Sequence, residues 1–225
     1  MSDDARPEPG LSTERLNFFT DAIFAIAMTL LAVELERPDK AELASARSLG
    51  RFLVDQRSSY LAFALSFALL WSVWRRHHQL MDRIRVLSKT FAFWHAPFLL
   101  LVAFLPFPTA VIGSAITNPM AQTLFAGTMA GILFCEVALK EVSADAGLVI
   151  GDVALARRHA NASWAVALWF TLSLGLAWAF SYAYLLWFLA PLAAGYGGTL
   201  VTRLRARRPA PHGEDGRRQD GREDG

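Results

Sequence analysis

The amino-acid sequence predicts an all-α, polytopic membrane protein with six transmembrane helices. Of its 225 residues, 54% are hydrophobic, and the mean hydropathy is +0.31. One soluble domain of this length would not bury so much apolar surface. The apolar residues are also gathered into blocks close to the roughly 20 residues that cross a bilayer as a helix. A third observation is that the 22 basic residues are divided unevenly between the intervening segments.

The expected spans follow the apolar blocks: Leu16–Leu35, Tyr60–Trp74 with a turn on either side, Phe91–Ile112, Ala121–Leu139, Trp164–Tyr182 and Ala183–Val201. The second span has the least sharp ends, because Arg57 and Arg75 crowd it. The last two spans join without Gly or Pro, which predicts a very tight turn. Counts of five or seven spans are the alternatives. Residues 1–202 form one transmembrane unit in this interpretation, and residues 203–225, rich in Arg, Gly, Asp and Pro, form a disordered tail.

The basic residues predict the orientation in the membrane. With six spans, both termini share a side with the segments that follow spans two and four. That side holds 17 of the 22 Lys and Arg residues, whereas the other side holds five, all within Arg37–Arg57. Because basic residues accumulate on the cytoplasmic side, both termini are expected in the cytoplasm. The Ala- and Arg-rich composition is consistent with a bacterial chain, so a bacterial cytoplasmic membrane is the expected location.

Several other classes of protein are disfavoured. The net charge of +2 is too small to suggest a nucleic-acid partner, and the single cysteine, Cys135, allows no internal disulfide and no cysteine-based metal site. The first apolar block follows fifteen mostly polar residues and has no small-residue cleavage site, so a retained helix is expected instead of a signal peptide. The adjacent His77 and His78 would point about 100° apart on a helix and would not chelate a metal together. With no nucleophile–base set either, the chain is not expected to be an enzyme or to carry a cofactor.

The first span contains the most informative polar residues. Asp21 lies about one turn inside the cytoplasmic boundary, where an unpaired carboxylate is destabilising. Asn17 shares its helix face, and Arg15 reaches it only partly. Trp74, His77 and their basic neighbours at the end of span two lie at the same membrane depth. We therefore expect a polar network that fastens span one to span two.

A strip on the outer half of the first span has a different character. Ile26, Thr29, Leu30 and Val33 are spaced three to four residues apart and share a face. Glu34 and Glu36 follow at the outer mouth. Repeated around a symmetry axis, such a strip forms a narrow hydrophobic pore with a rim that attracts cations. A strip of this kind more often faces lipid or a neighbouring helix.

Three further features bear on the later spans. The prolines of Leu105-Pro106-Phe107-Pro108-Thr109 must bend or end a helix, because neither ring nitrogen donates a hydrogen bond. Glu136 and Lys140 form a structural i,i+4 pair. The sequence Gly195-Tyr196-Gly197 lacks the context of a potassium filter and is rejected as one. The sequence offers no account of His95.

Three stretches together resemble the prokaryotic relatives of transmembrane protein 175, a lysosomal potassium channel. The opening Arg15-x-x-x-Phe19-Thr20-Asp21 and the residues up to Glu34 are similar to the family's first helix. Trp74-x-x-His77-His78 resembles the end of its second helix, and the Leu105–Thr109 stretch resembles its third. The detailed resemblance covers about the first half of the chain. Thr20 stands where the family usually has Ser, and the hydroxyl is kept.

This resemblance implies a homotetramer of six-helix subunits around a central cation pore lined by the first helix, without a carbonyl filter. Ile26, Thr29, Leu30 and Val33 would line the pore, with Ile26 as the constriction. Arg15, Phe19, Thr20, Asp21, Trp74 and His77 would hold the pore helix. Partners would be other copies of the chain and membrane lipid, and potassium would permeate. The alternatives are a proton-coupled transporter using Asp21 and His77, and a scaffold without transport activity.

Overall fold

The described residues are almost entirely helical. The computed structural model describes residues 12–84, 87–145, 153–190, 193 and 199–200, with the side chains of 153–159 left out. Within these residues the α-helices are α1 Thr13–Val33, α2 Ala46–Asp55, α3 Arg57–Met81, α4 Lys89–Phe104, α5 Pro106–Ser114, α6 Pro119–Asp145 and α7 Val153–Ala179. Two 3-10 helices, η1 Glu42–Ala44 and η2 Ala183–Leu189, complete the set. The predicted all-α class is confirmed.

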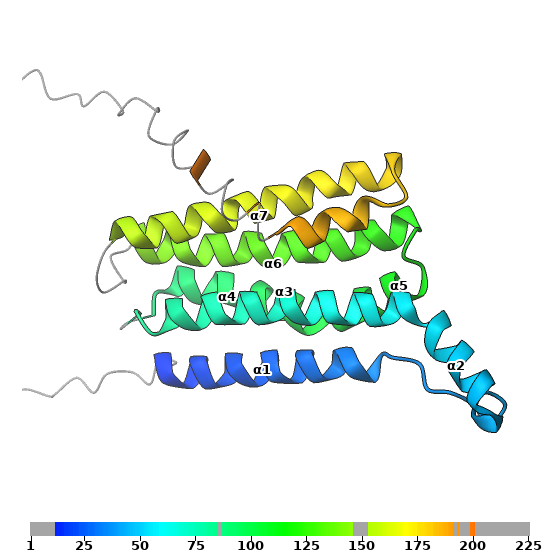
Figure 1. The fold of residues 1–225 in the computed structure, drawn as a ribbon. Helices are drawn as coiled ribbons and strands as arrows, with labels where there is room; N and C mark the ends of the chain where they lie inside the picture. Colours follow the sequence, from blue (N-terminus) through cyan, green and yellow to red (C-terminus); the bar gives the residue numbers. More distant parts are fainter. Residues whose placement is uncertain (1–11, 85–86, 146–152, 191–192, 194–198, 201–225) are drawn as a thin grey trace, which may run out of the picture.

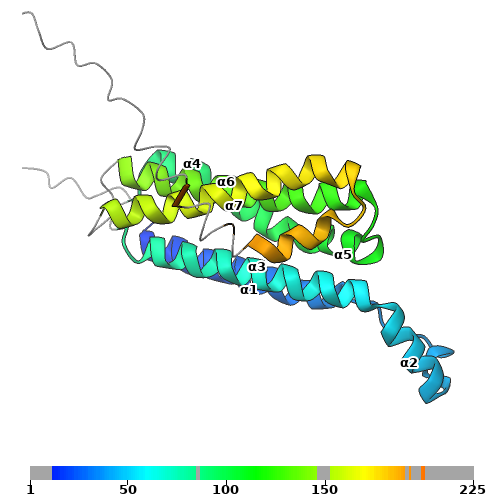
Figure 2. The same ribbon diagram turned by 45° about the horizontal axis from the view of Figure 1, so that its top comes forward.

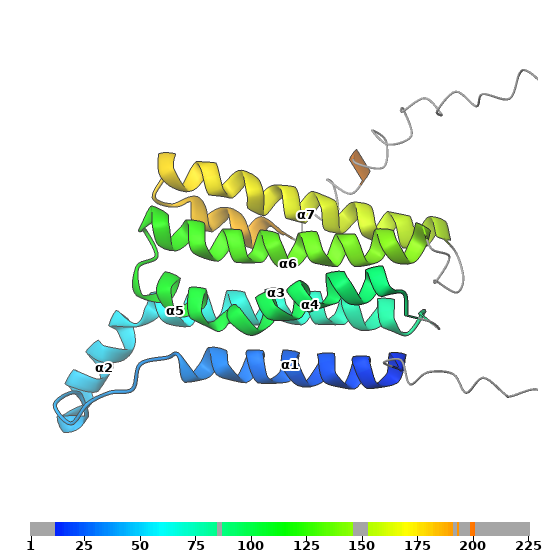
Figure 3. The ribbon, with the colours of Figure 1, turned by 180° about the vertical axis from the view of Figure 1, so that it is seen from behind.

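The long helices run side by side in layers (Figure 1). Helix α1 lies at one edge and packs against α3, α4 and α5, whereas α6 and α7 form the opposite edge and pack most extensively against each other. Figure 3 shows the same order from behind. Helix α1 therefore has other helices of the chain on one side only, within the part that the structure describes. Phe24, Phe98 and Phe125 are among the largest fully buried side chains of the interior.

Four helical segments are long and apolar enough to cross a membrane: Thr13–Val33, Lys89–Ser114, Pro119–Asp145 and Ala160–Ala179. They correspond to the predicted spans one, three, four and five. Helix α3 corresponds to the predicted second span, but it is longer than Tyr60–Trp74 and includes Arg75, Arg76 and two histidines. Most helices extend beyond the predicted apolar blocks, because a helix continues into the polar boundary on either side of the hydrocarbon core.

Prolines and polar caps determine several of the helix ends. Ser12 and Ser88 cap α1 and α4 by accepting hydrogen bonds from Arg15 N and Phe91 N. The predicted break at Leu105 is confirmed, since α4 ends at Phe104 and α5 begins at Pro106. Helix α5 then crosses α3 closely. A Cβ added at Gly113 would lie 3.0 Å from the Ser59 Cα, so only glycine fits this crossing without a shift.

The join between the last two predicted spans is a tight turn over residues 180–182, as expected. After it the chain forms the 3-10 helix η2, not the predicted α-helix, and runs back beside α7 (Figure 1). The buried Trp187 anchors this segment, with its indole Nε1 donating to Ser173 Oγ at 3.1 Å. Most of the expected span beyond residue 190, the Gly195-Tyr196-Gly197 stretch and the predicted tail at 203–225 lie outside the described residues.

The segment between α1 and α3 holds helices that the sequence interpretation missed. Helix η1 and helix α2 project from the end of the bundle (Figure 2). Ser45 and Ser48 begin α2 with a reciprocal capping box, each side chain receiving the other residue's backbone N–H at 3.1 Å. The predicted spans leave this segment as the connection between the first and the second, and α2, with ten residues and Gly50 inside it, has no apolar block of the length that marks a span.

Candidate pore helix and its polar base

Helix α1 has one buried face and one uncovered face. Its buried side chains recur at the spacing of a single helix face: Leu16, Thr20, Phe24, Ala27 and Leu31. On the other side, Ile26 is 58% exposed, Leu30 39% and Val33 59%, and Thr29 is exposed between them. Large apolar side chains in such a strip need a cover of lipid or protein.

The strip contains little free hydrogen-bonding capacity. The Thr29 hydroxyl donates to the Ile26 carbonyl oxygen at 2.8 Å, so its hydrogen is used within the helix. Glu34 and Glu36 follow at the end of α1, and both are exposed. The uncovered surface is therefore apolar along two turns and acidic at its end.

The buried face of α1 is tied to α3 and α4 through a chain of polar side chains. The Thr20 hydroxyl donates to the Leu16 carbonyl oxygen at 2.8 Å, and its oxygen lies 3.3 Å from His95 Nε2. His95 Nε2 also lies 3.2 Å from His77 Nε2, and the two rings stack with centroids 5.1 Å apart. All three side chains are buried.

The geometry of this chain favours one arrangement of hydrogens. Because Thr20 uses its hydrogen on Leu16, it accepts from His95, so the His95 hydrogen belongs on Nε2. That N–H also faces His77 Nε2, which accepts and leaves the His77 hydrogen on Nδ1. The His77 Nδ1 atom is buried without a hydrogen-bond partner among the described residues. The Thr20 hydroxyl and the Nε2 atoms of His95 and His77 can thus be satisfied while both imidazoles are neutral, whereas the His77 Nδ1–H is left without a partner among the described residues.

A second link joins the base of α1 to α3. The Trp74 indole Nε1 donates to Asp21 Oδ1 at 2.8 Å, and His78 Nδ1 lies 3.9 Å from the same oxygen. Trp74 packs between Trp71 and His78, with ring centroids 4.9 and 5.4 Å away. The Asp21 side chain is 35% exposed, so its carboxylate remains partly open at the N-terminal half of the helix.

A third cluster, which we call the α3–α6 ion cluster, consists of Arg76, Glu136, Lys140 and Ser163. Arg76 binds both carboxylate oxygens of Glu136, Nε at 2.8 Å and Nη2 at 2.9 Å. Lys140 Nζ donates to Glu136 Oε1 and, at 2.7 Å, to Ser163 Oγ on α7. The Glu136 side chain is fully buried, so one carboxylate holds two cations from α3 and α6.

The structure brings together only part of the set predicted to hold the first helix. Thr20, Asp21, Trp74 and His77 lie in the two links, although His77 reaches Thr20 only through His95. Arg15 and Phe19 are exposed, and neither side chain has a polar partner among the described residues. The sequence reasoning missed the role of His95, whose signal was a lone imidazole in an otherwise apolar helix. It anticipated the Glu136–Lys140 pair but not Arg76 or Ser163.

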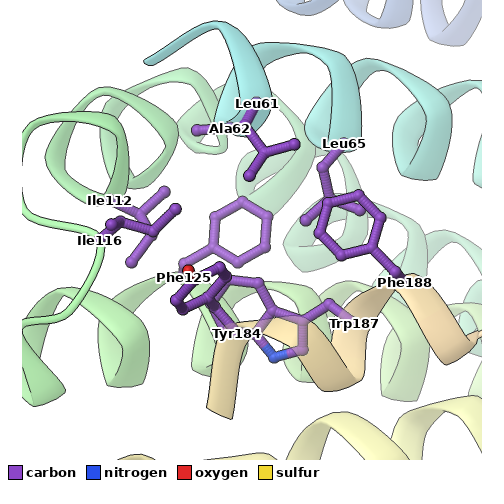
Figure 4. A pocket seen from close by; sticks show the side chains of 9 residues that line it. All are labelled: Leu61, Ala62, Leu65, Ile112, Ile116, Phe125, Tyr184, Trp187 and Phe188. Atoms are coloured by element: carbon purple, nitrogen blue, oxygen red, sulfur yellow. The ribbon is translucent and has the colours of Figure 1, made fainter. Parts of the chain in front are cut away.

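The interior at the other end of the bundle combines apolar side chains with a few buried polar ones, such as Ser66 and Thr109, which are hydrogen-bonded at 2.9 Å. A small cavity of about 10 Å³ lies between α3, α5, α6 and η2, and its lining exposes no polar surface (Figure 4). Phe125 and Trp187 pack against each other in its wall, with ring centroids 4.7 Å apart, among other aromatic and aliphatic side chains. This is barely the volume of one water molecule, and apolar cavities stay dry. The described residues also contain no group of three or more His, Cys, Asp or Glu side chains that could hold a metal ion.

Comparison with known proteins confirms the resemblance found in the sequence. The family model described as "Endosomal/lysosomal potassium channel TMEM175" matches residues 15–106. A potassium channel of Chamaesiphon minutus is 35% identical over 127 residues, covering 56% of this chain and 61% of that protein. A potassium channel of Streptomyces collinus is 32% identical, covering 48% and 51%. The matched part thus spans between half and two thirds of these relatives' length.

Two solved structures share the fold over most of the chain. The crystal structure of a lysosomal potassium-selective channel TMEM175 homologue from Chamaesiphon minutus has a TM-score of 0.68 at 24% identity, covering 87% of this chain and 98% of that one. A variant of the potassium channel MtTMEM175, crystallised with a nanobody fusion, has a TM-score of 0.61 at 14% identity, covering 92% and 99%. The family and these relatives are channels and not enzymes, in agreement with the expectation from sequence.

Proposed function

We propose that this relative of the transmembrane protein 175 channels is itself a potassium-permeable cation channel, a homotetramer whose central pore is lined by α1. The observation that carries the proposal is the uncovered apolar strip on α1, within the part of the chain that matches the family model. Ile26, Thr29, Leu30 and Val33 line the pore in this proposal. In a tetramer, four copies of this strip surround one axis, and the exposed apolar side chains of each copy are covered by those of the others.

The chemistry of the strip suggests how such a pore works. Apolar side chains offer an ion no ligands, so a cation passes a narrow apolar ring only by keeping or briefly shedding part of its water. Ile26, the most exposed large side chain near the middle of α1, forms the constriction. Potassium holds its water less tightly than sodium does, so a narrow ring favours potassium without a carbonyl filter. Glu34 and Glu36 raise the local cation concentration at the outer mouth.

The polar links keep α1 in place beneath this constriction. The residues on either side of Ile26 in the sequence are alanines, so rotating α1 by a fraction of a turn would put an alanine at the constriction. The pore helix must therefore be held at one rotation about its own axis. Thr20 and Asp21 lie one to two turns before Ile26, and both are tied to α3 or α4. Arg15 and Phe19, which the resemblance also assigns to this support, are exposed in the single subunit and are available to a neighbouring copy.

The membrane arrangement that goes with this function has six spans. Helix α3 forms the second span, and the segment that starts with η2 forms the sixth. Both termini lie in the cytoplasm of a bacterial cell, and lipid covers the outside of the tetramer. Support comes from the excess of basic residues on the side of the termini.

Ion flux into liposomes tests the proposal. The purified protein is reconstituted, and flux is driven first by a potassium gradient and then by an equal sodium gradient. Faster potassium flux that rises linearly with concentration supports the channel, and equal flux of the two ions removes the selectivity. Saturating flux that requires a proton gradient favours the transporter that uses Asp21 and His77. No flux from folded, tetrameric protein favours the scaffold.

A further inference from the structure

The segment between α1 and α3 forms an arm that leaves its own bundle. The arm comprises η1 and α2, residues 42–55, and packs mainly against itself, with few contacts to α3. It projects past the end of α1 and beyond the α1 edge of the bundle, away from α6 and α7 (Figures 1 and 3). It therefore extends to the same side as the uncovered face of α1.

The surface of the arm is incomplete in a single subunit. Leu43, Leu53 and Val54 are exposed, at 57%, 47% and 61%. Arg47 and Arg51 are four residues apart on one face of α2, and both are exposed. Neither guanidinium forms an ion pair among the described residues. The arm thus presents two free cations beside apolar side chains.

Complementary carboxylates lie at the outer end of α1. Asp39 and Glu42 satisfy each other's backbone N–H groups at 2.8 Å and are used within the loop. Glu34 and Glu36 are exposed and have no ion pair in the described part of the subunit. The buried Gln56 donates to the Glu36 carbonyl oxygen at 3.2 Å, which fixes the base of the arm beside these residues.

We propose that the arm of one copy docks on the outer mouth of the next copy, with Arg47 and Arg51 facing the next copy's Glu34 and Glu36. The inference rests on the proposed assembly around α1. In that assembly the uncovered face of α1 meets other copies. An arm that extends to the same side of the bundle therefore reaches over a neighbouring copy. The contact is a subunit interface outside the membrane. It holds the acidic rim at the pore entrance and offsets part of its negative charge, so the rim attracts cations less strongly than unpaired carboxylates would.

Crosslinking between differently marked subunits tests this contact. Cys135, the single cysteine, is buried and is replaced by alanine. Subunits carrying Arg51→Cys are co-expressed with subunits carrying Glu36→Cys and a size tag. A disulfide requires Cα atoms closer than about 7 Å, whereas the Cα atoms of a paired arginine and glutamate lie farther apart than that. A bismaleimide with a short spacer is therefore used to join the two cysteines. We expect tagged and untagged subunits to be linked, whereas Lys89→Cys, at the opposite end of the bundle, gives no link to Glu36→Cys.

Charge reversal provides an independent measurement. An exposed ion pair changes an association constant by up to about fivefold, so reversing two per interface weakens each interface by up to about 25-fold. The R47E/R51E variant should therefore dissociate at higher protein concentration than wild type in native mass spectrometry, and adding E34R/E36R should restore the tetramer.

The outcomes separate this interface from the proposed channel. Tetramers that conduct potassium but give no link between Arg51→Cys and Glu36→Cys subunits overturn the docking and leave the channel intact. An R47E/R51E variant that dissociates at the same protein concentration as wild type also overturns it, because the arm then contributes nothing to the contact between copies. A wild-type chain that stays monomeric removes both proposals.

Discussion

Removing the charge of Glu136 should destabilise the protein far more than removing that of Lys140. The α3–α6 ion cluster holds two cations and one anion, and the Glu136 side chain is fully buried while that of Lys140 is 6% exposed. Glu136→Gln keeps the shape but leaves Arg76 and Lys140 without a counter-charge. Breaking a buried ion pair from one side typically costs about 3–5 kcal/mol. The Arg76 side chain is 30% exposed and regains some hydration, so we expect about 3 kcal/mol.

Lys140→Met removes the surplus cation instead. The Arg76–Glu136 pair remains, with both of its hydrogen bonds, and Ser163 Oγ lies 3.4 Å from Glu136 Oε1 and can donate to it. The methionine side chain fills most of the lysine volume. The loss should therefore be no more than about 1 kcal/mol, the value of one ordinary hydrogen bond.

The assay is unfolding in mixed micelles by titration with a denaturing detergent, followed by the fluorescence of the seven tryptophans. Glu141→Gln is the matched control, since it is the same change one residue later and keeps an acceptor for Trp164 Nε1, which lies 3.2 Å from Glu141 Oε1. Its effect should stay within about 0.5 kcal/mol. Equal losses for Glu136→Gln and Lys140→Met, or a loss below about 1 kcal/mol for Glu136→Gln, would refute this reasoning.

Three further predictions concern helix contacts. Thr20→Val should lower the unfolding free energy by about 1–3 kcal/mol, because His95 loses its buried acceptor, and Thr20→Ser should not; equal losses would argue against the link. Trp74→Phe should cost about 1–2 kcal/mol through the lost hydrogen bond to Asp21 and should lower ion flux in liposomes, and unchanged flux would remove Asp21 from the support of α1. Gly113→Ala should cost about 1–3 kcal/mol through the 3.0 Å approach to Ser59, whereas Gly175→Ala, with open space around it, should stabilise α7 by up to about 1 kcal/mol. Similar effects at both glycines would contradict the close crossing of α3 and α5.

The sequence was sufficient to predict a contact where the membrane depth of a residue left few possible partners. Asp21 and Trp74 could be assigned to the same depth because the parity of the spans brings the base of α1 beside the end of α3. The break at Leu105 followed directly from the missing N–H groups of two prolines. The two faces of α1 likewise followed from helical spacing.

Other features depend on tertiary contacts that spacing does not encode. His95 lies on a helix without apolar periodicity to orient it, so only packing reveals that it bridges Thr20 and His77. Arg76 was expected in the network around Asp21 as one of the basic neighbours of Trp74, but it pairs with Glu136, sixty residues later. Helix α2 has a capping box, yet its brevity and Gly50 make it weak as an isolated helix.

The most direct test of the central claim is thiol modification of α1 during potassium flux. In a Cys135→Ala background, Ile26→Cys and Leu30→Cys are compared with Ala27→Cys, which lies on the buried face between them. A small, charged, water-soluble thiol reagent should block flux through the Ile26→Cys and Leu30→Cys proteins and leave the Ala27→Cys protein conducting. Flux that continues after complete modification of the residues introduced at 26 and 30 would contradict a pore along the uncovered face of α1.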